Sequence, residues 1–215
     1  MKGVIFDLDG VLVSTDELHY QAWKRLANEL GITTFTREDN ARQRGVSRMA
    51  SLEVVLEKCE KSFDEEEKVR LAELKNNYYK ESLKTLTPEC LLPGAEEVLK
   101  FLREKGIKTS VGSASKNAPE ILERIGILSL LDEISCGLDT TKSKPDPEVF
   151  LIAAEKLNLK PEECLVVEDS AAGIEAAKVG GMKSLAVGPL YQHLGGTFAA
   201  RDLAQVQDWD ALLED

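Results

Sequence analysis

The sequence of 215 residues has few cysteines, and their spacing is not that of metal ligands or of a disulfide framework. The four are Cys59, Cys90, Cys136 and Cys164, and no two of them form a Cys-x-x-Cys pair. This distribution argues against a zinc site and against a disulfide-rich secreted domain. We expect four reduced thiols that behave as small buried apolar side chains.

Long apolar runs and an excess of basic residues are also missing. No run approaches the roughly 20 apolar residues that a membrane-spanning helix needs, and the first residues lack the apolar stretch of a signal peptide. The net charge is −11 and the isoelectric point is near 4.9. Nucleic acids and anionic membranes require a basic surface, so we expect neither as a partner. A small phosphorylated ligand needs only a few local cations. We expect a cytoplasmic monomer.

Short apolar runs alternate with helical patterns over most of the chain, without an internal repeat. The runs that predict strands cover residues 4–8, 108–113, 133–137, 164–169 and 183–188. The patterns that predict helices between them cover residues 94–105, 117–127, 147–158 and 171–179. Nearly continuous apolar strands that alternate with helices predict an α/β fold, a doubly wound parallel sheet covered on both faces.

One interval, residues 14–86, interrupts this alternation and contains only helical patterns, over about 15–30, 46–59 and 65–82. It predicts an all-helical domain inserted after the first strand, with residues 1–13 and 87–215 forming the α/β core. Ser14 and Glu17 have the spacing of a capping box at the first of these helices. The insert has 14 acidic and 13 basic residues, a net charge of −1, and the remainder has 24 and 14, a net charge of −10. The insert is therefore the more basic part and a candidate source of cations for an anionic ligand.

Two acidic pairs follow predicted strands. Asp7 and Asp9 end the first strand, and because side chains two apart on an extended segment face the same way, they share one site. Gly10 then allows a sharp turn. Glu168 and Asp169 end another strand, although by themselves they could cap the helix that follows. Ligands bind at the carboxyl edge of such a sheet, and carboxylates crowded there suit a hard cation such as Mg²⁺.

Two further segments have the chemistry of phosphate binding. Small hydroxyl residues and free backbone amides before a helix form an anion site, and this pattern occurs in Ser113-Ala114-Ser115-Lys116-Asn117. Asn117 alone could be explained as a helix cap. Lys144 precedes Pro145, which favours an extended backbone, and Asp146 and Pro147 suit the cap and first position of the next helix. A solvated loop lysine is the alternative.

The order of these motifs, acid pair, hydroxyl, lysine and acid pair, resembles the haloacid dehalogenase superfamily of phosphotransferases over essentially the whole chain. The resemblance implies a Rossmann-like core with a helical cap. It implies that Asp7 is the nucleophile, that Asp9 is the general acid and base, and that Ser113 and Lys144 hold the transferred phosphoryl group. Mg²⁺ would be held by Asp7, the backbone carbonyl of Asp9, and Glu168 or Asp169.

Within the superfamily, the helical insert resembles that of the sugar phosphomutases. The segments that carry this resemblance are Arg44-Gly45-Val46-Ser47-Arg48, His19, Lys75, residues 113–117 and Glu168-Asp169-Ser170-Ala171-Ala172-Gly173-Ile174. It implies interconversion of β-glucose 1-phosphate and glucose 6-phosphate through bound glucose 1,6-bisphosphate. Substrate contacts would come from Arg44, Gly45, Val46, Arg48, Lys75, Ala114, Ser115, Lys116 and Asn117. Thr15 and His19, near the hinge, would couple closure of the insert to Asp9.

Several alternatives remain at this level. A phosphatase acting on sugar phosphates or other small metabolites has the same fold, and a non-enzymatic phospholigand-binding protein is a third class. His19 could be a packing residue, and Arg48 and Lys75 could be solvated. Trp23 and Leu26 are expected in the core of the insert. Arg44 stands where the family usually has lysine, which changes the reach and donor geometry of that contact.

Overall fold

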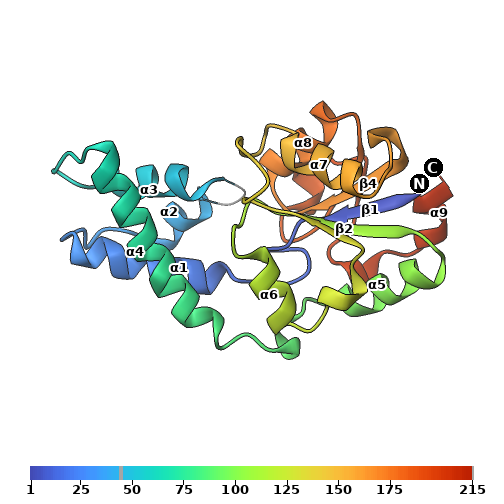
Figure 1. Cartoon of the computed structure of the whole chain (residues 1–215), viewed down its shortest axis with the longest axis horizontal. Coiled ribbons are helices and arrows are strands. Elements are labelled where there is room, and N and C mark those ends of the chain that lie inside the picture. The colour runs from blue at the N-terminus through green and yellow to red at the C-terminus, as the bar shows by residue number, and fades with distance from the viewer. Residues whose placement is uncertain (44–45, 215) are drawn as a thin grey trace. The chain divides into compact units, whose positions relative to one another are not determined.

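The chain forms two compact units. The computed structural model describes residues 1–43 and 46–214 (Figure 1). The first unit comprises Met1–Ser14 and Thr87–Asp215, and the second comprises Thr15–Leu86. Among the described residues, no helix has the length and apolar character needed to cross a membrane.

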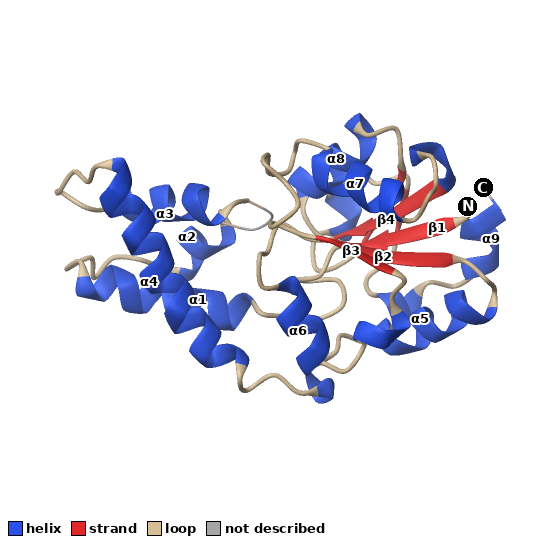
Figure 2. Cartoon of the chain, viewed as in Figure 1, coloured by secondary structure: helices blue, strands red, loops and turns tan. Residues whose placement is uncertain are grey.

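The first unit contains a six-stranded parallel sheet in the order β3-β2-β1-β4-β5-β6 (Figure 2). Its strands are β1 (Gly3–Phe6), β2 (Lys108–Gly112), β3 (Glu133–Ser135), β4 (Cys164–Glu168), β5 (Lys183–Ala186) and β6 (Phe198–Ala199). Every residue of β1 and β4 is buried. This is why their sequences are almost continuously apolar instead of alternating.

Helices cover both faces of this sheet. They are α5 (Ala95–Glu104), α6 (Ala118–Arg124), α7 (Glu148–Lys156), α8 (Ala171–Val179) and α9 (Trp209–Glu214). Figure 2 shows α7 and α8 on one side of the sheet and α5 on the other. Ile5 and Val166 of the central strands share a buried cluster with α7 and α8. The predicted doubly wound α/β fold is therefore confirmed.

Some local predictions need correction. The segment after Gly188 contains a sixth strand, β6. It was not predicted, because a strand of two residues shows no clear hydrophobic pattern. Helix α7 begins at Glu148, with Pro147 as its N-cap residue, so the predicted start is one residue early. Helix α1 (Asp16–Glu29) has Thr15 as its N-cap residue, so the capping box predicted for Ser14 and Glu17 is wrong.

The cysteine prediction is right in part. All four thiols are free, and Cys136 and Cys164 are buried, but Cys59 and Cys90 are only half-buried. Burial raises the pKa of the Cys164 thiol to about 11, which keeps it protonated and unreactive at neutral pH.

The second unit consists of four helices over the residues that the structure describes there. These are α1, α2 (Arg37–Ala41), α3 (Arg48–Leu56) and α4 (Glu65–Leu83). Its core gathers Trp23 and Leu26 of α1 with Leu52 of α3 and Ala72 of α4. The expected core position of Trp23 and Leu26 is confirmed. The short α2 was not predicted, because five residues give no helical period.

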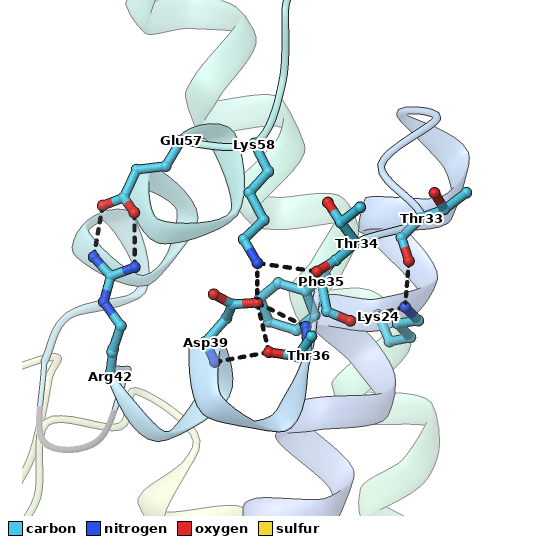
Figure 3. A network of polar contacts seen from close by, with 9 residues as sticks. All are labelled: Lys24, Thr33, Thr34, Phe35, Thr36, Asp39, Arg42, Glu57 and Lys58. Atoms are coloured by element: carbon cyan, nitrogen blue, oxygen red, sulfur yellow. Dashed lines mark hydrogen bonds and ion pairs between the residues drawn. The ribbon is translucent and has the colours of Figure 1, made fainter.

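A polar network fixes the segment between α1 and α3 (Figure 3). Thr36 and Asp39 form a capping box at α2, and Lys58 donates to the Asp39 carboxylate and to the Thr34 carbonyl. Burial disfavours the charged form of Asp39, but Lys58 and the Thr36 groups outweigh it, so the pKa of Asp39 is lowered. A second ion pair, Arg42 with Glu57, lies exposed on the surface.

These two ion pairs predict different effects on stability. Asp39→Ala removes the capping box and leaves Lys58 without its carboxylate, which we expect to cost about 1–3 kcal/mol of unfolding free energy. Glu57→Gln, at the exposed pair, should leave the unfolding midpoint unchanged. Both are measured by urea unfolding in a Trp209→Phe background, in which Trp23 is the sole tryptophan and reports on the second unit. Equal unfolding midpoints for the two variants would show that the Asp39–Lys58 network stabilises the second unit no more than the exposed pair does.

Candidate active site

Parallel strands bring the predicted acidic and hydroxyl residues to one edge of the sheet. Phe6, the last residue of β1, is in register with Val111 of β2 and Val167 of β4. Asp7 extends this ladder by donating its backbone N–H to the Val167 carbonyl at 2.9 Å. Asp7, Ser113 and Glu168 therefore lie at the carboxyl ends of three adjacent strands.

Lys144 reaches this edge from the loop between β3 and α7. Its ammonium Nζ donates to Asp7 Oδ1 at 2.5 Å and to Glu168 Oε2 at 2.7 Å. The lysine side chain is 1% exposed, so the alternative of a solvated loop lysine is wrong. The Phe150 ring of α7 lies 4.6 Å from the same ammonium, at cation–π distance.

The electrostatics of this group follow from its burial. Desolvation is the largest effect on the Asp7 carboxyl, and together with the negative charges of Glu168 and Asp9 it raises the pKa of Asp7 to about 7. The Lys144 ammonium favours the charged carboxylate and opposes this rise. Burial alone would lower the pKa of Lys144, but the two carboxylates outweigh it and raise that pKa. Lys144 is therefore a permanent cation, and the site carries more negative charge than this one cation neutralises.

Glu168 is held from both of its oxygens. Oε2 accepts from Lys144, and Oε1 accepts the backbone N–H groups of Asp169 and Ser170 at 3.0 and 2.9 Å and the Ser170 hydroxyl at 2.8 Å. Ser170 also caps α8, because its Oγ accepts the N–H of Gly173. The cap that the sequence suggested for the acidic pair is thus supplied by Ser170, which leaves Glu168 to face Lys144.

Two glycines leave the space that these carboxylates occupy. A Cβ atom at Gly173 would lie 1.9 Å from Glu168 Oε2. A Cβ atom at Gly10 would lie 2.0 Å from Asp169 Oδ2, and Gly10 has a positive φ of 84°. The sharp turn predicted at Gly10 is therefore present, and it also makes room for Asp169.

The donor set fits a hard divalent cation. Oxygen atoms of Asp7, Glu168 and Asp169 all lie within 4.8 Å of one another. Three carboxylates against one ammonium leave negative charge that Mg²⁺ would balance, and oxygen ligands are the ones it prefers. The Asp9 carboxylate is not part of this cluster, so its backbone carbonyl is the group that it could offer.

In the segment 113–117, two of the backbone amides that the sequence predicts to be free are hydrogen-bonded to the segment's own hydroxyl groups. The Ser113 hydroxyl accepts the N–H of Ser115 at 3.1 Å, and the Ser115 hydroxyl accepts the N–H of Asn117 at 3.2 Å. Ser113 is 4% exposed, whereas Ala114, Ser115 and Asn117 are half-buried and Lys116 is exposed. The loop thus combines one buried hydroxyl at a strand end with a more accessible portion before α6.

In the second unit, the predicted cap residues form a buried cationic group. Lys75 Nζ lies 2.7 Å from His19 Nδ1 and is 3% exposed, so the alternative of a solvated Lys75 is wrong. Burial, Lys75 and Arg48 hold the pKa of His19 well below its usual value, so the imidazole is neutral. A neutral ring whose Nδ1 accepts from an ammonium carries its proton on Nε2. Thr15, 1% exposed, begins the same helix and accepts the N–H of His19.

Trp23 was expected in the core, but sequence reasoning missed Tyr79 and the contact of Lys75 with both aromatic rings. The His19 ring stacks on Tyr79 with centroids 4.0 Å apart, and Lys75 Nζ lies 4.5 Å from the Trp23 ring and 4.8 Å from the Tyr79 ring. The spacing of four between Lys75 and Tyr79 on one helix was the available signal.

Of the predicted substrate loop, Val46 and Arg48 are half-buried, with Arg48 as the first residue of α3. Burial lowers the pKa of the Arg48 guanidinium. Arg44 and Gly45 lie outside the described residues, so the expected sugar contact there stays a prediction.

Comparisons with known proteins define the class to which this fold and site belong. A sequence profile of the haloacid dehalogenase-like hydrolases matches residues 4–187. The chain belongs to this family of enzymes, which confirms the resemblance drawn from the motifs.

Three relatives are informative. The chain is 40% identical to the β-phosphoglucomutase of Bacillus subtilis over 96% of its own length and 92% of that protein. It is 35% identical to a phosphorylated carbohydrates phosphatase of Thermotoga maritima, over 86% and 84% of the two chains. The crystal structure of a β-phosphoglucomutase from Clostridium difficile superposes with a TM-score of 0.92 at 38% identity, covering 100% of this chain and 96% of that one.

The pKa of Asp7 predicts a pH-dependent metal affinity. A carboxylate ligand must be deprotonated, so protons compete with Mg²⁺ below the Asp7 pKa of about 7. We expect calorimetry to give weaker Mg²⁺ binding with more proton release at about pH 6 than at about pH 8. Asp7→Asn should bind less tightly and lose this pH dependence. The same affinity and proton release at both pH values would contradict the prediction.

The packing of Gly173 predicts a loss of metal binding on a minimal substitution. Gly173→Ala places a methyl group on Glu168, and displacing such a residue costs about 10–100-fold in metal affinity. The fold should survive, because alanine is the better helix former. Val179→Ala, at an exposed position of α8, is the control and should leave Mg²⁺ binding unchanged. Wild-type Mg²⁺ affinity in Gly173→Ala would show that Glu168 moves freely.

Proposed function

We propose that this enzyme interconverts β-glucose 1-phosphate and glucose 6-phosphate, with Asp7 as the phosphoryl carrier and bound β-glucose 1,6-bisphosphate as the intermediate. The observation that carries the proposal is the 40% identity to the Bacillus β-phosphoglucomutase over nearly the full length of both chains. The Lys144 site supports it, because a buried ammonium between two carboxylates suits transfer of an anionic group.

In the first half-reaction, an Asp7 oxygen attacks the phosphorus atom of the bisphosphate. The new O–P bond forms as the bond between phosphorus and the sugar oxygen breaks, and Asp9 donates the proton that this oxygen takes up. Transfer of the C1 phosphoryl group in this way yields glucose 6-phosphate. In the second half-reaction, β-glucose 1-phosphate takes the place of that product, and Asp9 removes the proton of its 6-hydroxyl. The 6-oxygen attacks the phosphoryl group on Asp7, the O–P bond to Asp7 breaks, and the bisphosphate is formed again. Lys144 neutralises charge on the phosphoryl oxygens, and Ser113 holds one of them.

Mg²⁺ would be held by Asp7, the Asp9 carbonyl, and Glu168 or Asp169, and would supply charge neutralisation to the transferred phosphoryl group. Four hydrogen bonds, one of them from Lys144, fix the direction of the Glu168 carboxylate.

A mutase needs a second anion site for the phosphate that is not being transferred. Ser115, Lys116 and Asn117 are the candidates in the first unit, and Arg48 and Lys75 are the candidates in the second. A planar guanidinium such as that of Arg48 suits phosphate, and Lys75 is a buried lysine beside the neutral His19 ring. His19 would contribute its Nε2 proton as a hydrogen-bond donor.

The alternative function is hydrolysis of a sugar phosphate. It is favoured by the 35% identity to the phosphorylated carbohydrates phosphatase of Thermotoga maritima. The two functions differ in the fate of the phosphoryl group on Asp7. A mutase must return it to the sugar, whereas a phosphatase releases it as inorganic phosphate.

The test follows both products in one reaction. The protein is incubated with Mg²⁺, β-glucose 1-phosphate and a trace of the bisphosphate, and glucose 6-phosphate is read by a coupled dehydrogenase while inorganic phosphate is measured in parallel. We expect glucose 6-phosphate in large excess over phosphate. Stoichiometric phosphate with little glucose 6-phosphate would establish the phosphatase instead.

Two variants assign the roles. Asp7→Asn should abolish both products, because it removes the phosphoryl acceptor. Arg48→Ala should lower the ratio of glucose 6-phosphate to phosphate, because a weakly held intermediate escapes and leaves the phosphoenzyme to water. An unchanged ratio in Arg48→Ala would remove Arg48 from the second anion site.

A further inference from the structure

The loop of residues 136–147, between β3 and α7, must hold Lys144 with unusual accuracy. Its ammonium reaches Asp7 and Glu168 together, at 2.5 and 2.7 Å, from a long and intrinsically flexible side chain. The flexible Lys144 side chain can hold its ammonium in this position only if the loop backbone is fixed, because every shift of the main chain moves the ammonium with it.

The main chain just before Lys144 is fixed by a carboxylate of α7. Glu148 Oε2 accepts the backbone N–H groups of Thr141 and Lys142, both at 2.7 Å, and Oε1 accepts the Thr141 hydroxyl at 3.1 Å. These bonds lower the pKa of Glu148, so the carboxylate is ionised and the hydrogen bonds are charge-assisted. They join the loop to the first turn of a helix anchored in the core.

The start of the loop is tied to the same helix. Lys156, at the end of α7, donates to the Ile134 carbonyl at 2.6 Å and to Asp139 Oδ1 at 2.8 Å, and Asp139 Oδ2 accepts the N–H of Cys136 at 2.8 Å. Phe150, which lies between Glu148 and Lys156 on α7, places its ring against the Lys144 ammonium. Helix α7 thus contacts the loop at two places before Lys144 and at Lys144 itself.

We propose that Glu148 is a positioning residue for phosphoryl transfer, whose carboxylate holds the backbone of residues 141–142 and thereby sets the place of the Lys144 ammonium between Asp7 and Glu168. The inference rests on the proposed role of Lys144 in phosphoryl transfer but not on the identity of the sugar. Glu148 itself touches no reacting atom.

A simpler role for Glu148 is stabilisation of α7 through its place in the first helical turn, where an acidic side chain is favourable. The two roles differ in what they require of the side chain. A favourable charge at the helix start is supplied equally by aspartate, whereas the bonds to Thr141 and Lys142 need the full length of glutamate.

The test compares Glu148→Gln, Glu148→Asp and the control Glu155→Gln, an exposed glutamate on the same helix. The substrate is para-nitrophenyl phosphate, because its hydrolysis requires phosphoryl transfer but no second anion site. We expect Glu148→Gln to lower kcat about 10- to 100-fold, with KM changed less than kcat and Tm close to that of the control. Glu148→Asp should be intermediate, and Glu155→Gln should match the wild type.

Amide hydrogen exchange supplies a second readout, which needs no turnover. Peptides covering residues 138–147 should exchange faster in Glu148→Gln than in Glu155→Gln, while the strands exchange alike. Unchanged exchange in this segment would overturn the proposal. A wild-type kcat in Glu148→Asp, or a loss of kcat in Glu148→Gln that only follows a fall in Tm, would overturn it as well.

Failure of the proposed function gives a different pattern. If glucose 6-phosphate is not formed but para-nitrophenyl phosphate is hydrolysed, the mutase is discarded and the comparison of Glu148 variants still decides the positioning role.

Discussion

The ion pair network of Lys144 with Asp7 and Glu168 is the interaction on which the rest of the core site depends. Burying one ammonium and two carboxylates costs several kcal/mol per ion unless their mutual attraction and further hydrogen bonds offset it. The structure supplies these from elements that are distant in sequence: the end of β1, the end of β4 and the loop before α7. Each is joined to the parallel sheet, so the sheet's register sets the separation of the charges. A change in register would leave a buried charge unpaired.

The part of the fold that sequence could predict is the part in which local pattern and global packing agree. Central strands of a doubly wound sheet are buried on both faces, so β1 and β4 appear as short apolar runs whose ends are marked by acidic residues. Strand β6 and helix α2 were not predicted, because they are too short to show a hydrophobic period and are fixed by contacts with distant residues. The start of α7 was misplaced by one residue, within the usual fraying of helix boundaries.

The candidate site shows the same division. Asp7 follows β1 and Glu168 ends β4, so topology alone predicted their common edge. The burial of Lys75 was not predictable in this way, because a lysine among the charged residues of α4 has the same local pattern whether it faces water or a neighbouring helix. Only the packing of α1 against α4 places Trp23, His19 and Tyr79 around it. The contacts of Glu148 were not predicted for a similar reason. An acidic residue in a first helical turn is common, and its partners here lie in the preceding loop.

The fit of Glu168 against Gly173 has a consequence for how this centre can vary among relatives. The long carboxylate and the missing side chain occupy one volume, so the two positions are not independent choices. A shorter acid at 168 would leave a void and lose the ion pair with Lys144, and a side chain at 173 would displace the Glu168 carboxylate. Either single substitution is therefore expected to impair the site. The effects of substitutions at these two positions are therefore expected not to add, because the acid that ends β4 and the first turn of α8 share one volume.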